Sequence, residues 1–175
     1  MIYKILGSIT LMLALLVLGA WNFHTTVCTN RSFNAPVADV WRVWNGADSI
    51  QKWWGPKGYS ALVVRNDVRE GGSYLWAMKS EQGKMFWSTG TYKEVIPNKK
   101  IVSTMSFSNE NGKQIPGSQV SVPGQWPNEI TVIVAFSESQ GTTRVTVTEV
   151  GIPLIVYAMS KIGWAQQFDK IQLLL

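Results

Sequence analysis

The architecture of this chain is indicated most clearly by ITVIVAFSESQGTTRVTVTEV, residues 130–150, and by LIVYAMSKIGWAQQFDKIQLLL, residues 154–175. The first stretch alternates apolar and polar residues on both sides of Gly141, a pattern typical of a β-hairpin. In the second stretch apolar residues recur at helical spacing with Lys161 and Asp169 between them, which predicts an amphipathic helix. An antiparallel sheet that is followed by such a helix must bury one of its faces against it.

The residues before the hairpin predict one strand, two short helices and then four further strands. The first strand covers residues 25–34, and Pro36 begins the first helix, since proline costs no hydrogen bond at the first helical position. A capping box at residues 48–51 begins the second helix, which Gly55-Pro56 ends. The stretch 109–128 is rich in Gly, Pro, Asn, Ser and Gln, and it predicts a long loop that forms a lid or rim.

Together these elements predict an α+β fold in which a curved antiparallel sheet wraps around a long C-terminal helix. A long sheet twists, so it can curl around a helix rather than lie flat against it. Such an arrangement leaves a space between sheet and helix, and that space is the expected ligand cavity.

The N-terminal part of the chain differs from the rest, because residues 5–21 carry no charge and follow Lys4. We expect residues 1–23 to form a single transmembrane anchor and residues 24–175 to form the folded domain. The positive charge near the start predicts that the N-terminus stays cytoplasmic and that the domain is exported to the periplasmic or extracellular face. The alternative is a signal peptide cleaved after Leu18-Gly19-Ala20, which would release a secreted domain.

Composition excludes several classes of site. The net charge is +5, but the basic residues are scattered among acidic ones, so no nucleic-acid partner is expected. One cysteine, Cys28, and one histidine, His24, cannot supply a zinc site, and no metal or other cofactor is expected.

Several motifs resemble a known family when they are taken in order: RSFNAP at residues 31–36, WWGP at 53–56, DVREGG at 67–72 and GTYKEVIP at 90–97. They are similar to the domains of activators of the heat-shock-protein ATPase and their mostly bacterial homologues, within the SRPBCC or START-like superfamily. The resemblance implies the helix-grip fold that START-like lipid carriers, polyketide cyclases and the birch-pollen allergen group share. It does not imply one activity.

The first function we expect is the binding of a hydrophobic small molecule or lipid, without catalysis, by a membrane-tethered domain. Aromatic and methionine side chains suit adaptable apolar pockets. The candidate lining residues are large apolar residues on strands and on the last helix: Trp76, Met78, Trp87, Met105, Phe107 and Phe168. The alternative for each of them is that it simply fills the core.

Two other functions stay open. A protein-interaction or co-chaperone-like module would use an exposed corner at Trp53 and Trp54, unless these indoles pack under the edge of the sheet. A cyclase- or hydrolase-like enzyme would need a tuned acid, for which the candidates are Asp67, Glu70, Glu94 and Glu149. None of these acids pairs with a nucleophile in the sequence pattern, so we do not expect an enzyme.

Overall fold

The computed structural model describes Val17 and residues 19–175. Most of the predicted anchor, residues 1–23, lies outside the described residues. Within the described part, no helix combines the length and the apolar character needed to cross a bilayer.

The domain is built on a seven-stranded antiparallel sheet with the order β1-β7-β6-β5-β4-β3-β2. Its strands are β1 (His24–Phe33), β2 (Tyr59–Asn66), β3 (Ser73–Ser80), β4 (Met85–Ile96), β5 (Lys100–Ser108), β6 (Ile130–Ser139) and β7 (Thr142–Pro153). The strands β2 to β7 follow one another as a meander, whereas β1 pairs with β7 at the far edge. The helices α2 (Val37–Asn45) and α3 (Ala47–Trp53) therefore carry the chain from one edge of the sheet to the other.

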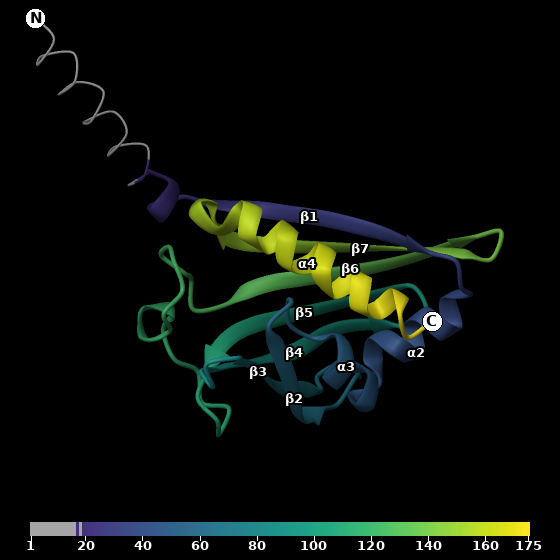
Figure 1. Ribbon diagram of the computed structural model, residues 1–175, viewed down its shortest axis with the longest axis horizontal. Coiled ribbons are helices and arrows are strands. Elements are labelled where there is room, and N and C mark those ends of the chain that lie inside the picture. The colour runs from purple at the N-terminus through teal and green to yellow at the C-terminus, as the bar shows by residue number, and fades with distance from the viewer. Residues whose placement is uncertain (1–16, 18) are drawn as a thin grey trace, which may run out of the picture.

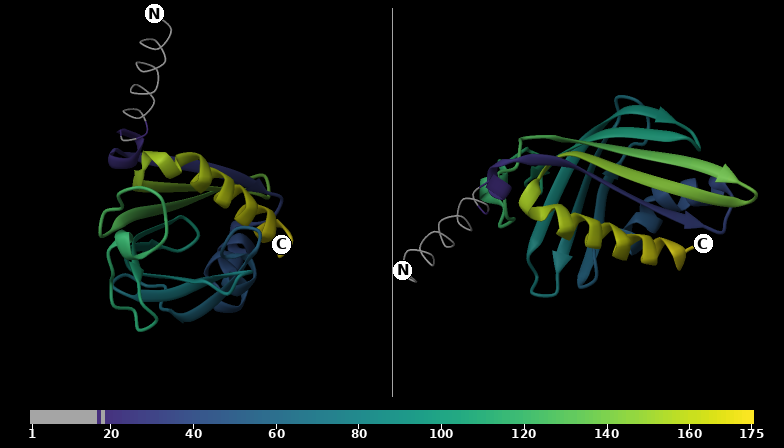
Figure 2. Two further views of the ribbon diagram at one scale, coloured as in Figure 1. Left: turned by 60° about the vertical axis from the view of Figure 1, so that its left-hand side comes forward. Right: turned by 90° about the horizontal axis from the view of Figure 1, so that it is seen from above.

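The C-terminal helix α4 (Tyr157–Gln172) runs across the concave side of the sheet (Figure 1). The sheet curves around this helix, and α2 and α3 close the same side of the molecule (Figure 2). This arrangement confirms the predicted α+β architecture, in which a curved sheet wraps around the last helix.

The structure corrects two details of the helices. The capping box predicted at residues 48–51 is absent: α3 begins at Ala47 after Gly46, and no side chain caps it. The last helix begins later than predicted, because a 3₁₀ turn, η2 (Leu154–Val156), precedes α4. Met159 and Ile162 were expected on the apolar stripe, but their exposed fractions are 60% and 58%.

The buried row of α4 consists of Trp164, Gln167, Phe168 and Ile171, and its three apolar members confirm that part of the predicted helical stripe. These positions recur at intervals of three and four residues, so they share one face of the helix. Gln167 is polar, but its side-chain oxygen accepts a hydrogen bond from the backbone N–H of Gly55 at 3.0 Å. That bond satisfies a group that would otherwise be buried without a partner.

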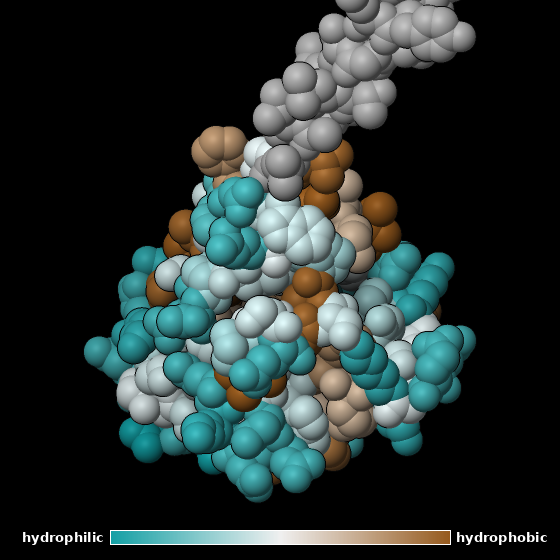
Figure 3. Space-filling view, turned by 90° about the vertical axis from the view of Figure 1, so that its left-hand side faces the viewer, coloured by the Kyte–Doolittle hydropathy of each residue, from teal (hydrophilic) through white to brown (hydrophobic). Residues whose placement is uncertain are grey.

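The predicted long loop joins β5 to β6 and contains a short 3₁₀ turn, η1 (Gly117–Gln119). Gln125 holds this loop against the start of the domain: its N–H donates to the carbonyl of Trp21 at 3.0 Å, and its carbonyl lies 2.7 Å from Nε2 of His24. Figure 3 shows this end of the domain, where hydrophobic side chains lie among hydrophilic ones.

Candidate functional site

A cavity of about 60 Å³ lies between the inner face of the sheet and α4. Strands β3 to β7 and the helices α2, α3 and α4 all contribute to its wall. The lining residues are Trp44, Asn45, Trp53, Trp54, Tyr74, Trp76, Tyr92, Ile101, Ser103, Met105, Val132, Val134, Glu149 and Trp164. Seven of these fourteen side chains are aromatic, and five of the seven are tryptophan.

The aromatic rings contact one another around the cavity. The ring of Trp44 stacks on that of Trp164 with a centroid distance of 6.0 Å and an interplanar angle of 7°. Trp54 meets Trp76 edge to face at 5.1 Å, and Trp76 lies 4.5 Å from Tyr74. Such contacts add to the burial energy of each ring, so the rings of the aromatic wall stabilise one another.

Gly90 on β4 leaves room for the ring of Tyr74 in the cavity wall. Tyr74 is paired with Gly90 across the sheet, and its hydroxyl donates to the carbonyl of Thr104 at 2.8 Å. A Cβ atom at position 90 would overlap the Thr104 carbonyl and lie 2.7 Å from the Tyr74 ring. The glycine is therefore required by this close approach.

Both tyrosines of the wall are neutral hydrogen-bond donors. Burial raises the pKa of Tyr74 well above its ordinary value, and burial likewise raises the pKa of Tyr92. The Tyr92 hydroxyl donates to Oδ1 of Asn66 at 2.6 Å.

Two indole N–H groups, those of Trp54 and Trp76, are buried without a hydrogen-bond partner among the described residues. An orphaned buried donor costs free energy. The hydrogen-bond donors of this part of the aromatic wall are therefore left unpaired by the described residues.

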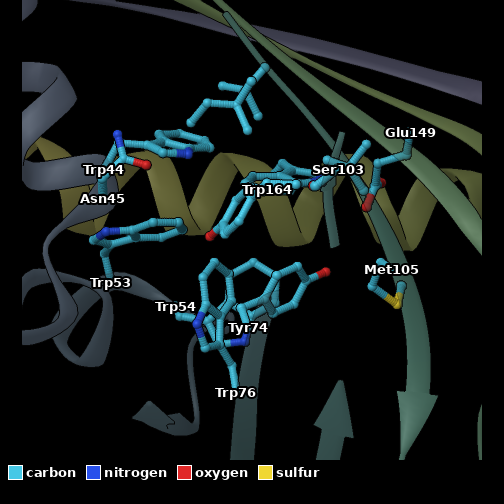
Figure 4. A pocket seen from close by; sticks show the side chains of 14 residues that line it. Trp44, Asn45, Trp53, Trp54, Tyr74, Trp76, Ser103, Met105, Glu149 and Trp164 are labelled. Atoms are coloured by element: carbon cyan, nitrogen blue, oxygen red, sulfur yellow. The ribbon is translucent and has the colours of Figure 1, made fainter. Parts of the chain in front are cut away.

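Of the residues that the structure describes, Glu149 is the one carboxylate in the cavity wall. It accepts hydrogen bonds from the hydroxyl of Ser160 and from the Trp164 side chain, both on α4. Burial raises the pKa of Glu149, and these two hydrogen bonds oppose that rise because they stabilise the ionised form. Figure 4 shows Glu149 and Met105 toward one side of the cavity, with Trp44, Trp53 and Trp54 toward the other.

The sequence contained a signal for the position of Glu149. In β7 the buried residues Thr143, Val145 and Val147 alternate with more exposed ones, and Glu149 continues the same parity. Successive residues of a strand point to opposite faces, so an acid in this row must face inward.

The structure brings together only some of the predicted lining residues. Trp76 and Met105 line the cavity. Met78 lies further along β3 and packs against the turn at Gly55, while the ring of Phe107 packs on Trp126 with a centroid distance of 5.1 Å. Trp87 lines a separate, more open hollow beside the long loop.

Phe168 belongs to the core rather than to the cavity wall. It is 1% exposed, and its ring contacts Phe33 and Trp164 at centroid distances of 6.0 Å each.

Trp53 and Trp54 do not form an exposed corner. Trp53 is 1% exposed and its indole N–H donates to the carbonyl of Val43 at 3.0 Å, whereas Trp54 is half-buried. Both lie in the cavity wall, which agrees with the alternative that these indoles pack beneath the sheet. Their role in contacting a partner stays a prediction.

Two of the acids considered for catalysis, Asp67 and Glu94, form ion pairs with basic neighbours. Asp67 pairs with Arg69 and Glu94 pairs with Lys100, in both cases at 2.9 Å near the surface. Across the described residues, no group of three His, Cys, Asp or Glu side chains is arranged to hold a metal ion. Cys28 is exposed as a free thiol.

A curved antiparallel sheet around a C-terminal helix, with a cavity between them, defines this protein as a helix-grip domain. The model of one family, "Activator of Hsp90 ATPase homolog 1-like protein", matches residues 34–175. The chain therefore belongs to the family of Activator of Hsp90 ATPase homolog 1-like proteins.

Solved structures of bacterial proteins share the fold. A crystal structure from Chromobacterium violaceum has a TM-score of 0.72 and 22% identity, covering 85% of this chain and 95% of that one. The crystal structure of a protein from Mycobacterium smegmatis has a TM-score of 0.70 and 22% identity, and the match covers 86% of this chain and 90% of that one. The AHSA1 protein of Silicibacter pomeroyi has a TM-score of 0.67 and 15% identity, and the match covers 85% of this chain and 96% of that one. A search of curated proteins found no match.

Proposed function

We propose that this domain binds a small, largely apolar molecule in the cavity between the sheet and α4, and that it does so without catalysis. The observation that carries the proposal is the aromatic wall, in which seven of fourteen lining side chains are aromatic. Ligand sites in proteins are mostly apolar and aromatic with a few placed polar groups, here Ser103, Glu149 and the tyrosine hydroxyls.

The size of the cavity limits the ligand. A water molecule needs roughly 10–15 Å³ of such space, so 60 Å³ holds a few waters or one small molecule. Sites for drug-sized ligands are larger, at about 300–1,000 Å³. The volume supports a ligand of a few heavy atoms rather than a lipid whose long acyl chains are fully enclosed.

The experiment is a thermal-shift and tryptophan-fluorescence screen of the purified domain against small aromatic, aliphatic and amine compounds. A ligand at about 100 times its Kd stabilises the folded state by about 2.7 kcal/mol, which raises Tm by roughly 5–10 °C for a chain of this size. The cavity lies against five tryptophans, so binding should also change their fluorescence.

A matched pair of variants locates the site. Ser103→Leu places a larger side chain in the cavity and should abolish the shift, whereas Val102→Leu, on the other face of β5, should leave it unchanged. If no compound stabilises the wild type, or if Ser103→Leu binds as well as Val102→Leu, the proposal is wrong.

A co-chaperone-like role is the second candidate, and the family name is the observation that favours it. Substituting both Trp53 and Trp54 would not test this role, because Trp53 is buried and its loss would disturb the fold itself. The long loop between β5 and β6 is the better target. Pull-down of a heat-shock ATPase that is lost on shortening this loop would support the role, and equal capture by both forms would count against the loop.

We also propose that residues 1–23 tether the domain to a membrane, with the domain on the exported side, a placement that excludes the co-chaperone-like role on a cytosolic ATPase. The support is the uncharged stretch 5–21 behind Lys4. Cell fractionation with N-terminal sequencing tests the tether: an intact chain in the membrane pellet supports it, a soluble mature chain that begins near residue 21 supports signal cleavage, and an intact soluble chain contradicts both.

A further inference from the structure

Glu149 has no cationic partner in the described structure. Its neighbours in the register are Val27 on β1 and Val132 on β6, and its hydrogen-bond partners on α4 are Ser160 and Trp164. Among the described residues, no lysine, arginine or histidine lines the cavity, and no ion pair includes this carboxylate.

A carboxylate taken out of water is costly unless it is paired. The hydrogen bonds from Ser160 and Trp164 meet part of that cost and hold the carboxylate in place. They do not neutralise its charge, so the electrostatics of the cavity favour a positively charged occupant.

The remainder of the wall favours the same kind of occupant. The face of an aromatic ring carries negative partial charge and attracts a cation within about 6 Å of the ring centroid, with tryptophan the strongest of the three ring types. The rings of Trp44, Trp54, Trp76 and Trp164 line one cavity together with Glu149. A neutral apolar ligand would use the rings but leave the carboxylate uncompensated.

We propose that the cavity binds a small organic cation, a substituted ammonium whose charge lies against the Glu149 carboxylate and whose alkyl groups contact the tryptophan faces. This inference rests on the proposed small-molecule function and names the class of its ligand. The cation can be a free molecule or the ammonium headgroup of a lipid, since both present the same chemistry.

Choline and 3,3-dimethylbutan-1-ol form the decisive pair of probes, because they have the same shape and differ in charge. Isothermal titration on the wild-type domain should give choline the lower Kd, by on the order of tenfold. In Glu149→Gln, which keeps the shape of the side chain, this preference should disappear. Glu110→Gln removes one negative charge from an exposed acid and should bind both probes as the wild type does.

The pH dependence provides a second readout that does not need a variant. Choline keeps its charge at every pH, so any change in its affinity comes from the protein. Its binding should weaken as pH falls and Glu149 takes up a proton, while binding of the neutral analogue should not weaken. Tyr74, the titratable group that interacts with Glu149 from β3, stays neutral in this range because its pKa is raised, and Glu129 near the start of β6 is exposed.

The outcomes separate the two proposals. If the neutral analogue binds the wild type as tightly as choline or more tightly, the cation inference is wrong and the small-molecule function stands. If neither probe binds and the wider screen is also negative, both are wrong. Dihexanoylphosphatidylcholine, a short-chain lipid, identifies the source of the cation. If it binds more tightly than choline and Glu149→Gln loses this binding, the ligand is a lipid headgroup. If it binds more weakly than choline, the ligand is a free cation.

Discussion

At the scale of single residues, Glu149 is distinctive because it is an acid in the inward row of β7, which it continues after Thr143, Val145 and Val147. Burial raises its pKa in the folded protein above the ordinary value. The folded state therefore binds this proton more tightly than the unfolded state, and the contribution of Glu149 to stability falls as pH rises through the folded pKa.

We predict that Glu149→Gln removes this pH dependence. The free energy of unfolding of the variant minus that of the wild type should increase as pH rises through the folded pKa of Glu149. Urea unfolding at several pH values measures this difference. A difference that is constant with pH would show that Glu149 titrates alike in both states.

Gly90 and Gly163 give a second prediction, because they have opposite surroundings. Alanine at position 90 would collide with Thr104 and the ring of Tyr74, so Gly90→Ala should lower the free energy of unfolding by about 1–3 kcal/mol. Alanine at position 163 meets nothing within 4 Å and removes a glycine from α4, so Gly163→Ala should raise stability by about 0.5–1 kcal/mol. Thermal unfolding of the two variants should show shifts of opposite sign.

At the scale of elements, α4 is joined to the turn after α3 by polar contacts as well as by packing. Nζ of Lys170 donates to the carbonyls of Gly55 at 2.7 Å and Pro56 at 3.2 Å, and burial lowers the pKa of Lys170. Gln167 adds its bond to the Gly55 N–H. The WWGP segment therefore both ends α3 and seats the C-terminal half of α4.

We predict that Lys170→Met lowers the free energy of unfolding by about 1–3 kcal/mol, because carbonyls at this turn lose a charged donor. Lys161→Met is the control on the same helix. Lys161 lies over the ring of Tyr157 at 5.7 Å, a contact worth about 0.5–1 kcal/mol at an exposed site. Equal losses in the two variants, measured by urea unfolding, would contradict a special role for the Lys170 contacts.

At the scale of the whole molecule, the space enclosed by sheet and helix divides into a packed core and a cavity. Phe168 lies in the core, so Phe168→Ala should cost about 3–5 kcal/mol of unfolding free energy. It does not line the cavity, so the remaining folded protein should bind ligand with unchanged Kd. Urea unfolding and titration of the same sample test both parts, and a large loss of affinity in protein that is still folded would place Phe168 in the site after all.

The period of the sequence predicts which face of an element points inward, but not how far the cavity extends along it. Trp76 and Met78 have the same parity on β3, as do Met105 and Phe107 on β5, yet only the first of each pair lines the cavity. The missed residues Trp44 and Trp164 come from α2 and α4, and their stacking depends on how two distant helices cross.

The sequence by itself determined the order of strands and helices, the curved sheet around a C-terminal helix and the family, because periodicity and short motifs are local properties of the chain. Only the tertiary structure decided that Trp53 and the half-buried Trp54 lie in a cavity wall, and that Glu149 lines the same cavity without a basic partner among the described residues. These properties arise from side chains that different strands and helices contribute to one cavity. Their meeting depends on the twist of the sheet and the seating of α4, which no local pattern encodes.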